Sequence, residues 1–148
     1  MGVSGTALNF GGDDVVFIPS TNSLNPSMIY IDVWVQFYDI GTYKEIVNKM
    51  SPDLLAGYRI FRTIHNTIAT VIRTNIGLYS FEEAVVTVNP GIWYHIISIY
   101  DGNKLELYID NLLVTWIPAG GNIIPSSTPL LIGKSNFPED PGFFYGII

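Results

Sequence analysis

Apolar and polar side chains alternate between Met28 and Tyr38 with a period of two residues. In a β-strand this period places successive side chains on opposite faces, so one face of the segment is apolar throughout. The apolar face carries Ile29, Ile31, Val33, Val35 and Phe37. The opposite face carries Tyr30, Asp32, Trp34, Gln36 and Tyr38. The pattern predicts a strand whose apolar face packs on a second sheet, while the other face turns toward a groove or toward solvent.

Further short strand patterns follow along the chain, each closed by turn-forming residues. They are expected at residues 15–18, 45–50, 57–63, 67–74, 76–81, 84–88, 93–100, 104–109, 112–117, 130–133 and 143–148. No window has the caps and periodicity of an amphipathic helix, although residues 51–55 could form one turn. Many short strands joined by frequent turns predict an all-β sandwich or barrel, and a length of 148 residues suits one domain.

Composition restricts the partners of this domain. Charged residues make up only 14% of the chain, and the net charge of −6 argues against nucleic acid, whose binding needs clustered Lys and Arg. No apolar run approaches the roughly 18 residues that a membrane-spanning helix requires. A surface poor in charge is common on extracellular and assembled proteins, so we expect an extracellular or cell-surface location.

The first residues, 1–5, lack the charged and apolar segments of a signal peptide. Two alternatives therefore stand beside each other at this point. The chain is a cytosolic protein, or it is a mature or excised segment of a secreted one.

Four segments, in order, resemble the laminin-G-like jelly rolls of the concanavalin A-like lectin and glucanase superfamily. They are residues 7–16 (ALNFGGDDVV), 31–35 (IDVWV), 91–111 (with GIWYHIISIYDG and LELYIDN), and 130–133 (LLIG) followed by 143–148 (FFYGII). The resemblance covers nearly the whole chain. It implies an antiparallel jelly roll of two sheets, with ligands on the concave face or at the loops along one edge.

The sequence departs from this family pattern at its end. Family members usually continue from the final glycine and isoleucine into an acidic pair and a further apolar strand, whereas this chain stops at Ile148. The resemblance therefore predicts a single domain over residues 1–148 that lacks its final strand. It also predicts an open strand edge, at which a second chain could pair through unpaired backbone groups.

The acidic residues do not form the pair that glycoside hydrolysis requires. That reaction needs two carboxyl groups facing each other across a sugar bond, and in the glucanases they occupy alternate positions on one strand. Here Asp13 and Asp14 are adjacent, Glu82 and Glu83 are adjacent, and Glu139-Asp140 lies between prolines. Adjacent side chains on a strand point to opposite faces. The sequence therefore predicts a protein that is not an enzyme.

The two histidines, His65 and His95, give no zinc signature, because no cysteine accompanies them and no metal-binding spacing links them. His95 shares a predicted strand face with Trp93 and is expected to be a packed, hydrogen-bonded structural residue. His65 lies in a predicted turn and is expected to be solvated.

Calcium is the metal that this chemistry favours, because Asp, Asn and backbone oxygens from loops are its usual ligands. Asp13 and Asp14 follow Gly11-Gly12 and could contribute, as could Asp101 or Asp110 with Asn111. The alternative is that these residues serve only tight turns. We expect either no cofactor or one calcium ion at Asp13 and Asp14, whose usual acidic partners at the end of the domain are missing.

The polar face of the strand at residues 28–38 is the candidate ligand site. Sugar rings could stack on the aromatic side chains of Tyr30, Trp34 and Tyr38. The sugar hydroxyl groups could form hydrogen bonds with Asp32 and Gln36, and Trp93 could lie nearby. The alternative is an aromatic stripe packed under a loop.

The expected function is a non-catalytic binding or adhesion module for carbohydrate or a protein surface. A structural subunit that self-assembles through an open sheet edge is the second interpretation, and a glucanase-like hydrolase is the least favoured.

Overall fold

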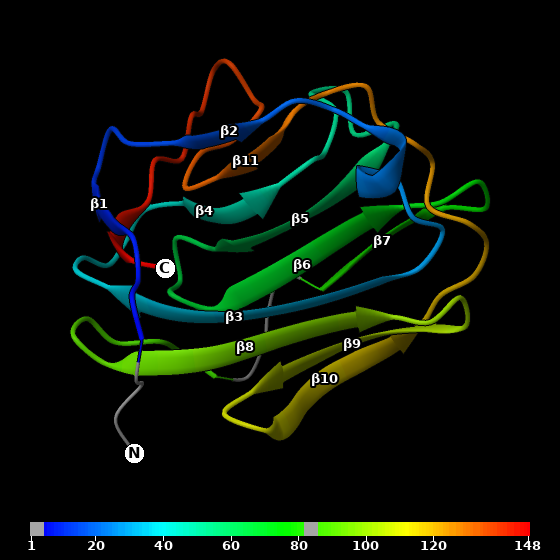
Figure 1. Ribbon diagram of the computed structural model, residues 1–148. Helices are drawn as coiled ribbons and strands as arrows, with labels where there is room; N and C mark the ends of the chain where they lie inside the picture. Colours follow the sequence, from blue (N-terminus) through cyan, green and yellow to red (C-terminus); the bar gives the residue numbers. More distant parts are fainter. Residues whose placement is uncertain (1–4, 82–85) are drawn as a thin grey trace.

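The computed structural model describes residues 5–81 and 86–148, and in them the chain forms two antiparallel sheets (Figure 1). Sheet A contains, in spatial order, β1 (Asn9–Gly11), β12 (Tyr145–Ile147), β3 (Ile29–Phe37), β8 (Trp93–Tyr100), β9 (Lys104–Ile109) and β10 (Leu112–Pro118). Sheet B contains β2 (Val16–Ile18), β11 (Leu130–Ile132), β4 (Lys44–Asn48), β5 (Gly57–Arg62), β6 (Ile68–Arg73) and β7 (Leu78–Phe81). The predicted all-β, two-sheet sandwich is confirmed.

The strand boundaries agree with the sequence pattern with a few differences. Residues 51–55 form turns and bends, and a short 3-10 helix at Asn22–Leu24, which was not predicted, precedes β3. The expected strand at 84–88 begins outside the described residues, and its described part contributes only an isolated bridge between Thr87 and Thr67. Glu82 and Glu83 also lie outside the described residues.

The core lies between the two sheets and confirms the assignment of faces on β3. Val35 and Phe37 are fully buried, and the other odd-numbered residues of the strand pack against the same cluster. Sheet B contributes Ile46, Ile60, Ile68 and Ile72 to this cluster. Each fully buried Val, Leu, Ile or Phe side chain contributes about 1.5–3 kcal/mol, so Val35 and Phe37 together contribute about 3–6 kcal/mol.

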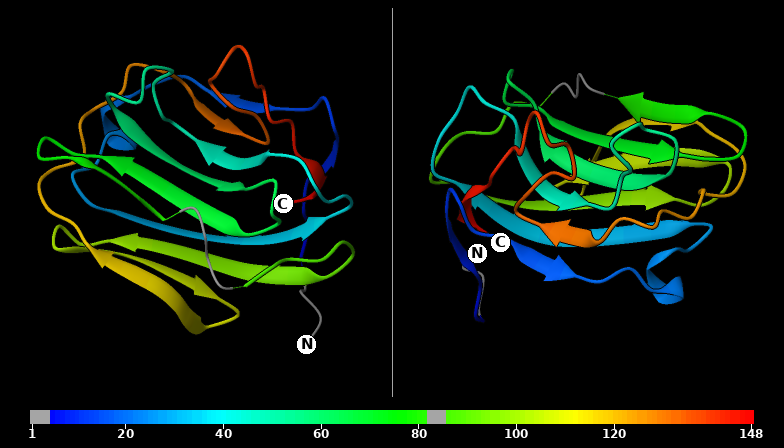
Figure 2. Two further views of the ribbon diagram at one scale, coloured as in Figure 1. Left: turned by 180° about the vertical axis from the view of Figure 1, so that it is seen from behind. Right: turned by 90° about the horizontal axis from the view of Figure 1, so that it is seen from above.

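The last strand closes sheet A beside the first strand. Figure 2 shows from above that β1 and the C-terminal segment lie together at one end of the sandwich. β12 pairs with β1 on one side and with β3 on the other. Leu8 and Ile148 continue the ladder, since each backbone N–H donates to the other residue's carbonyl oxygen at 2.8 and 3.0 Å. Gly146 permits this insertion, because its φ is +147° and a Cβ there would overlap the carbonyl oxygen of Gln36.

The unpaired edge expected at the end of the chain is therefore not beside β12; it lies along β3. On this side β12 pairs only with Gln36 and Phe37, whereas β8 pairs with β3 from Ile29 to Gln36 on the other side. Tyr38 donates its N–H to Tyr145 on the β12 side. Because backbone groups alternate in direction along a strand, those of Tyr30, Asp32 and Trp34 point to the same side. Among the described residues no strand pairs with them there.

A buried lysine ties β2, β11 and β4 of sheet B together. Lys49, directly after β4, is fully buried, and its Nζ donates to Ser20 Oγ at 2.9 Å and to the carbonyl oxygens of Ser126 and Thr128 at 3.0 and 2.8 Å. These acceptors lie in the segments that follow β2 and precede β11. Burial lowers the pKa of the Lys49 ammonium. The three neutral acceptors replace water around a charge that no described carboxylate neutralises.

Replacing this lysine by an apolar side chain of similar length should destabilise the domain. We expect Lys49→Met to lower the free energy of unfolding by about 1–3 kcal/mol, because the carbonyl oxygen of Thr128 loses the bond from Nζ and that of Ser126 keeps only the bond from Ser20 Oγ. Urea unfolding measures the effect. Lys104→Met is the matched control, since that side chain is 43% exposed and its ion pair contributes at most about 1 kcal/mol. A Lys49 variant as stable as the natural protein would contradict this account.

Candidate functional site

The five predicted ligand-binding residues lie together on the outer face of sheet A. Tyr30, Asp32, Trp34 and Tyr38 are exposed and Gln36 is partly buried. The exposed fraction reaches 60% for Tyr30, so no described loop covers this part of the face. The alternative that the aromatic stripe packs under a loop is therefore wrong for this end of β3.

Asp32 holds a small cluster of side chains in place. The Nε2 atom of His95 lies 2.7 Å from Asp32 Oδ1, and the Tyr30 hydroxyl donates to Asp32 Oδ2 at 3.3 Å. The imidazole of His95 stacks on the indole of Trp34, with 4.6 Å between centroids and 6° between planes. The expectation of a packed, hydrogen-bonded His95 is confirmed, and its packing orients the tryptophan of the candidate site.

The other end of the face, near β12, is organised differently. Gln36 Nε2 donates to the carbonyl oxygen of Gly91 at 2.9 Å, and Trp93 lies opposite Gln36 in the β3–β8 register. Tyr38 meets Tyr145 edge to face, with ring centroids 5.3 Å apart. Gln36 and Tyr38 thus have partners of their own, and the cluster around Asp32 is the more open part of the predicted site.

Two further aromatic residues extend this face and were missed in the sequence. By register, Tyr108 of β9 and Trp116 of β10 lie on the same side of sheet A as Asp32, and Trp116 is 55% exposed. A β-bulge between Leu113 and Thr115 shifts the register of β10. Strict alternation places residues three apart on opposite faces, whereas the bulge brings Leu113 and Trp116 to one face.

A second site, a cavity on the outer face of sheet B, has a chemistry that the sequence did not reveal. Its lining includes Tyr43, Glu45, Leu54, Arg59, Phe61, Phe137, Glu139 and Asp140. Glu45 is 3% exposed, and its Oε1 accepts a hydrogen bond from Arg59 Nη1 at 2.9 Å. Burial raises the pKa of Glu45 to about 7, although the nearby Arg59 charge opposes the rise. A β-bulge lies beside Glu45, where the β4–β5 register shifts between Glu45 and Val47.

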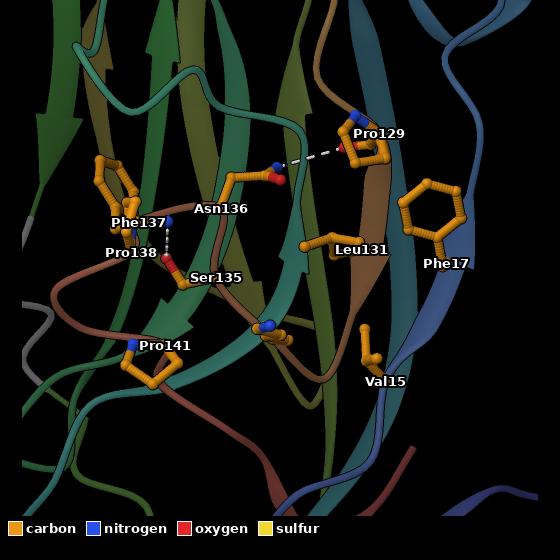
Figure 3. A pocket seen from close by; sticks show the side chains of 10 residues that line it. Val15, Phe17, Pro129, Leu131, Ser135, Asn136, Phe137, Pro138 and Pro141 are labelled. Carbon is orange, nitrogen blue, oxygen red and sulfur yellow. Dashed lines mark hydrogen bonds between the residues drawn. The ribbon is translucent and has the colours of Figure 1, made fainter.

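An apolar hollow adjoins this cavity (Figure 3). Phe17 and Val15 lie on one side of Leu131, and the loop from Ser135 to Pro141 lies on the other. The loop is held by short-range hydrogen bonds, such as the one from Phe137 N to Ser135 Oγ at 2.8 Å. Phe137 lines both the hollow and the cavity around Glu45, so the loop forms a wall between them.

The predicted calcium ligands lie in an exposed turn after β1. Asp14 Oδ2 accepts a hydrogen bond from Gly11 N at 2.7 Å, which is the role of a turn residue, and Asp13 is exposed beside it. Within residues 5–81 and 86–148, no three His, Asp or Glu side chains come together as a metal-binding group. Calcium takes six to eight oxygen ligands, so two carboxylates of one turn fit it only with additional carbonyl or water oxygens. Calcium at Asp13 and Asp14 stays a prediction.

An antiparallel sandwich of two six-stranded sheets is the fold of the concanavalin A-like class of β-sandwich domains. The chain belongs to the concanavalin A-like lectin/glucanases superfamily, whose laminin G family model matches residues 10–148. The resemblance found in the sequence is confirmed. A comparison with curated protein sequences found no match.

Solved structures of several binding domains share this fold. Domain 4 of AbnA, an extracellular arabinanase of family GH43 from Geobacillus stearothermophilus, in complex with arabinotriose, superposes with a TM-score of 0.74 and 16% identity, covering 99% of this chain and 68% of that one. The CBM40 of the Ruminococcus gnavus IT-sialidase, bound to α2,3-sialyllactose, gives 0.72 and 10%, covering 99% and 86%. Domains LG4-5 of the mouse laminin α1 chain give 0.69 and 11%, covering 98% and 40%. In the part of the chain that is described, no helix is long and apolar enough to cross a membrane.

The raised pKa of Glu45 predicts an unusual dependence of stability on pH. Between pH 4.5 and 7 the folded protein keeps a proton that the unfolded chain has released. The free energy of unfolding should therefore fall as the pH rises through this window, by up to about 3 kcal/mol. Urea unfolding at several pH values measures this slope.

Glu45→Gln should remove this contribution, because the amide does not titrate. Glu139→Gln, at an exposed position of the neighbouring loop, is the matched control and should keep the slope. If the natural protein and the Glu45 variant differed by the same amount at pH 5 and pH 8, the account would be wrong.

Proposed function

We propose that this domain is a non-catalytic, extracellular carbohydrate-binding module, and that sugars bind over Trp34 on the outer face of sheet A. The observation that carries the proposal is the cluster around Asp32. His95 covers one face of the indole and fixes its orientation, so the ring needs little ordering when a ligand arrives. A ligand ring can stack on such a platform, as aromatic side chains combine a large apolar surface with a defined geometry.

Asp32 supplies the polar half of this recognition. Each carboxylate oxygen has two lone pairs, and the bonds from His95 and Tyr30 use one on each oxygen. The remaining lone pairs can accept hydrogen bonds from ligand hydroxyl groups. The Tyr30 hydroxyl and the more distant Trp116 extend the surface that a chain of sugars would cover.

The comparisons support a sugar rather than a protein surface as the ligand. Two of the similar structures are described in complex with arabinotriose or sialyllactose. Two carboxylates of this face are already paired with a neighbouring side chain. Glu106 pairs with Lys104 at 2.7 Å, and Asp32 pairs with His95.

Loss of the indole should weaken glycan binding without unfolding the domain. A glycan array identifies a ligand, and calorimetry then compares Trp34→Ala with the natural protein. We expect about a thirty-fold rise in Kd, corresponding to roughly 2 kcal/mol for a stacked tryptophan. Phe17→Ala is the matched control, because Phe17 is 62% exposed on β2 of sheet B, and this variant should bind as the natural protein does.

The same assay tests the calcium prediction. We propose that sugar binding needs no metal, so Kd should be equal with calcium and with a chelator. Sugar binding that requires calcium, and that Asp13→Asn weakens even when calcium is present, would instead place the ion at the turn after β1. A natural protein that binds no glycan, or a Trp34 variant with unchanged affinity, would overturn the proposed function.

A second candidate function, self-assembly as a structural subunit, is favoured by one observation. The backbone groups of Tyr30, Asp32 and Trp34 form an unpaired edge in the described sheet. Such an edge can pair with a strand of another copy. An apolar groove lined by Ile29, Ile31 and Leu130, among others, opens beside it and could receive alternate side chains of that strand.

Sedimentation velocity over a concentration series tests this assembly. If it occurs, the average mass should rise with concentration, and Tyr30→Pro should suppress the rise because it removes an N–H from the open edge. Tyr30→Ala removes the same side chain but keeps the N–H, so it should assemble normally. A natural protein that stays monomeric at every concentration would exclude this function.

A further inference from the structure

The cavity on the outer face of sheet B is built by a loop that crosses the strands. The loop from Gly133 to Gly142 lies over β4 and β5, and Glu45 N donates to the carbonyl oxygen of Gly142 at 2.8 Å. This bond fixes the loop beside the buried carboxyl group. The cavity lies on the opposite side of the sandwich from the Trp34 face, so the two sites share no residue.

One oxygen of the buried carboxyl group has no partner. Glu45 Oε1 accepts from Arg59, whereas Oε2 is enclosed and has no hydrogen bond in the described structure. The amide of Asn48 is near enough to lower the pKa of Glu45, yet its Nδ2 and Glu45 Oε2 do not meet the geometry of a hydrogen bond. A buried acceptor without a donor is costly, and a ligand that brings a donor removes that cost.

Arg59 pairs with Glu45 and packs against two rings, while its buried Nε has no hydrogen-bond partner in the described structure. Its guanidinium lies 4.0 Å from the ring centroid of Phe61 and 4.8 Å from that of Phe137, and it donates to Glu45. The other charged groups in the lining are the carboxylates of Glu139 and Asp140, which are exposed at the rim. With Glu45 ionised, the cavity holds three carboxylates and one guanidinium, so it favours a cation.

We propose that this cavity is a second ligand site, which takes a primary ammonium group carried on an apolar stem. The ammonium donates to the unpaired carboxyl oxygen of Glu45, and the rim carboxylates of Glu139 and Asp140 attract its charge from a longer distance. The stem lies against the rings of Tyr43 and Phe137. A bare metal ion fits less well, because these acids do not come together as a metal-binding group in the described structure.

Binding of an ammonium group should release a proton. The titratable or charged groups that line the cavity with Glu45 are Tyr43, Arg59, Glu139 and Asp140. Among them Glu45 changes its charge near neutral pH, and the ligand favours its ionised form. The affinity should therefore rise about tenfold per pH unit below pH 7 and level off above it.

Three small probe molecules of similar size distinguish the effect of charge from the effect of a hydrogen-bond donor. Titrations followed by amide NMR shifts compare n-butylammonium with n-butanol, which has no charge, and with tetramethylammonium, which has no donor. We expect butylammonium to bind at least about tenfold more tightly than either, because a charge-assisted hydrogen bond needs both features. Shifted amide signals should lie in β4, β5 and the loop from 133 to 142.

Variants connect the binding to these residues. Glu45→Gln should abolish the preference for butylammonium over butanol and the pH dependence. If this variant fails to fold, the exposed pair Glu139→Gln with Asp140→Asn still tests the rim, and should weaken butylammonium binding about tenfold or more. Trp34→Ala should bind the amine normally, so failure of the sugar site and failure of this site are distinguishable.

Two results would overturn the proposal. One is equal binding of butanol and butylammonium, which would mean that the cavity selects ligands by shape and not by charge. The other is tight amine binding that survives both Glu45→Gln and the double rim variant, which would place the amine elsewhere on the molecule.

Discussion

The two faces of β3 are the constraint on which the rest of the structure depends. Odd-numbered side chains of this strand enter the core between the sheets, and even-numbered ones form the outer face with Asp32 and Trp34. A shift of register by one residue would exchange the two sets and destroy both core and site. Pairing with β8 along Ile29–Gln36 holds the register, and the same pairing places His95 opposite Trp34. Fold and candidate sugar site are thus consequences of one alternation.

The C-terminal segment closes sheet A and also encloses the cavity on sheet B. After β11 the chain forms the loop from Gly133 to Gly142 and then enters sheet A as β12. The close approach at Gly146 fixes where this segment enters, and the bond from Glu45 N to Gly142 fixes where the loop crosses β4. The enclosure of Glu45, and with it the raised pKa, therefore follows from the route that the chain takes to close the sandwich.

Alternation in the sequence was sufficient for the fold class and for the outer face of β3, because a period of two directly encodes which side chains share a face. It was insufficient for Trp116, since the bulge in β10 changes the face without any local signal. Glu45 was missed for a different reason. Its burial depends on a loop some ninety residues later in the chain. Long-range closure of this kind is not expressed in short-range pattern.

The two sites differ in how many of their carboxylate oxygens already have a hydrogen-bond partner. We expect them to bind ligands in different ways for this reason. On sheet A, both oxygens of Asp32 already have donors, so the cluster is preorganised and a ligand adds contacts to a finished arrangement. In the cavity on sheet B, the carboxyl group of Glu45 has one oxygen paired with Arg59 and one unpaired, and it bears its proton over much of the pH range. A ligand there must supply a hydrogen-bond donor to the unpaired oxygen, and its binding changes the charge of Glu45. Binding in the cavity on sheet B is therefore coupled to the protonation of Glu45.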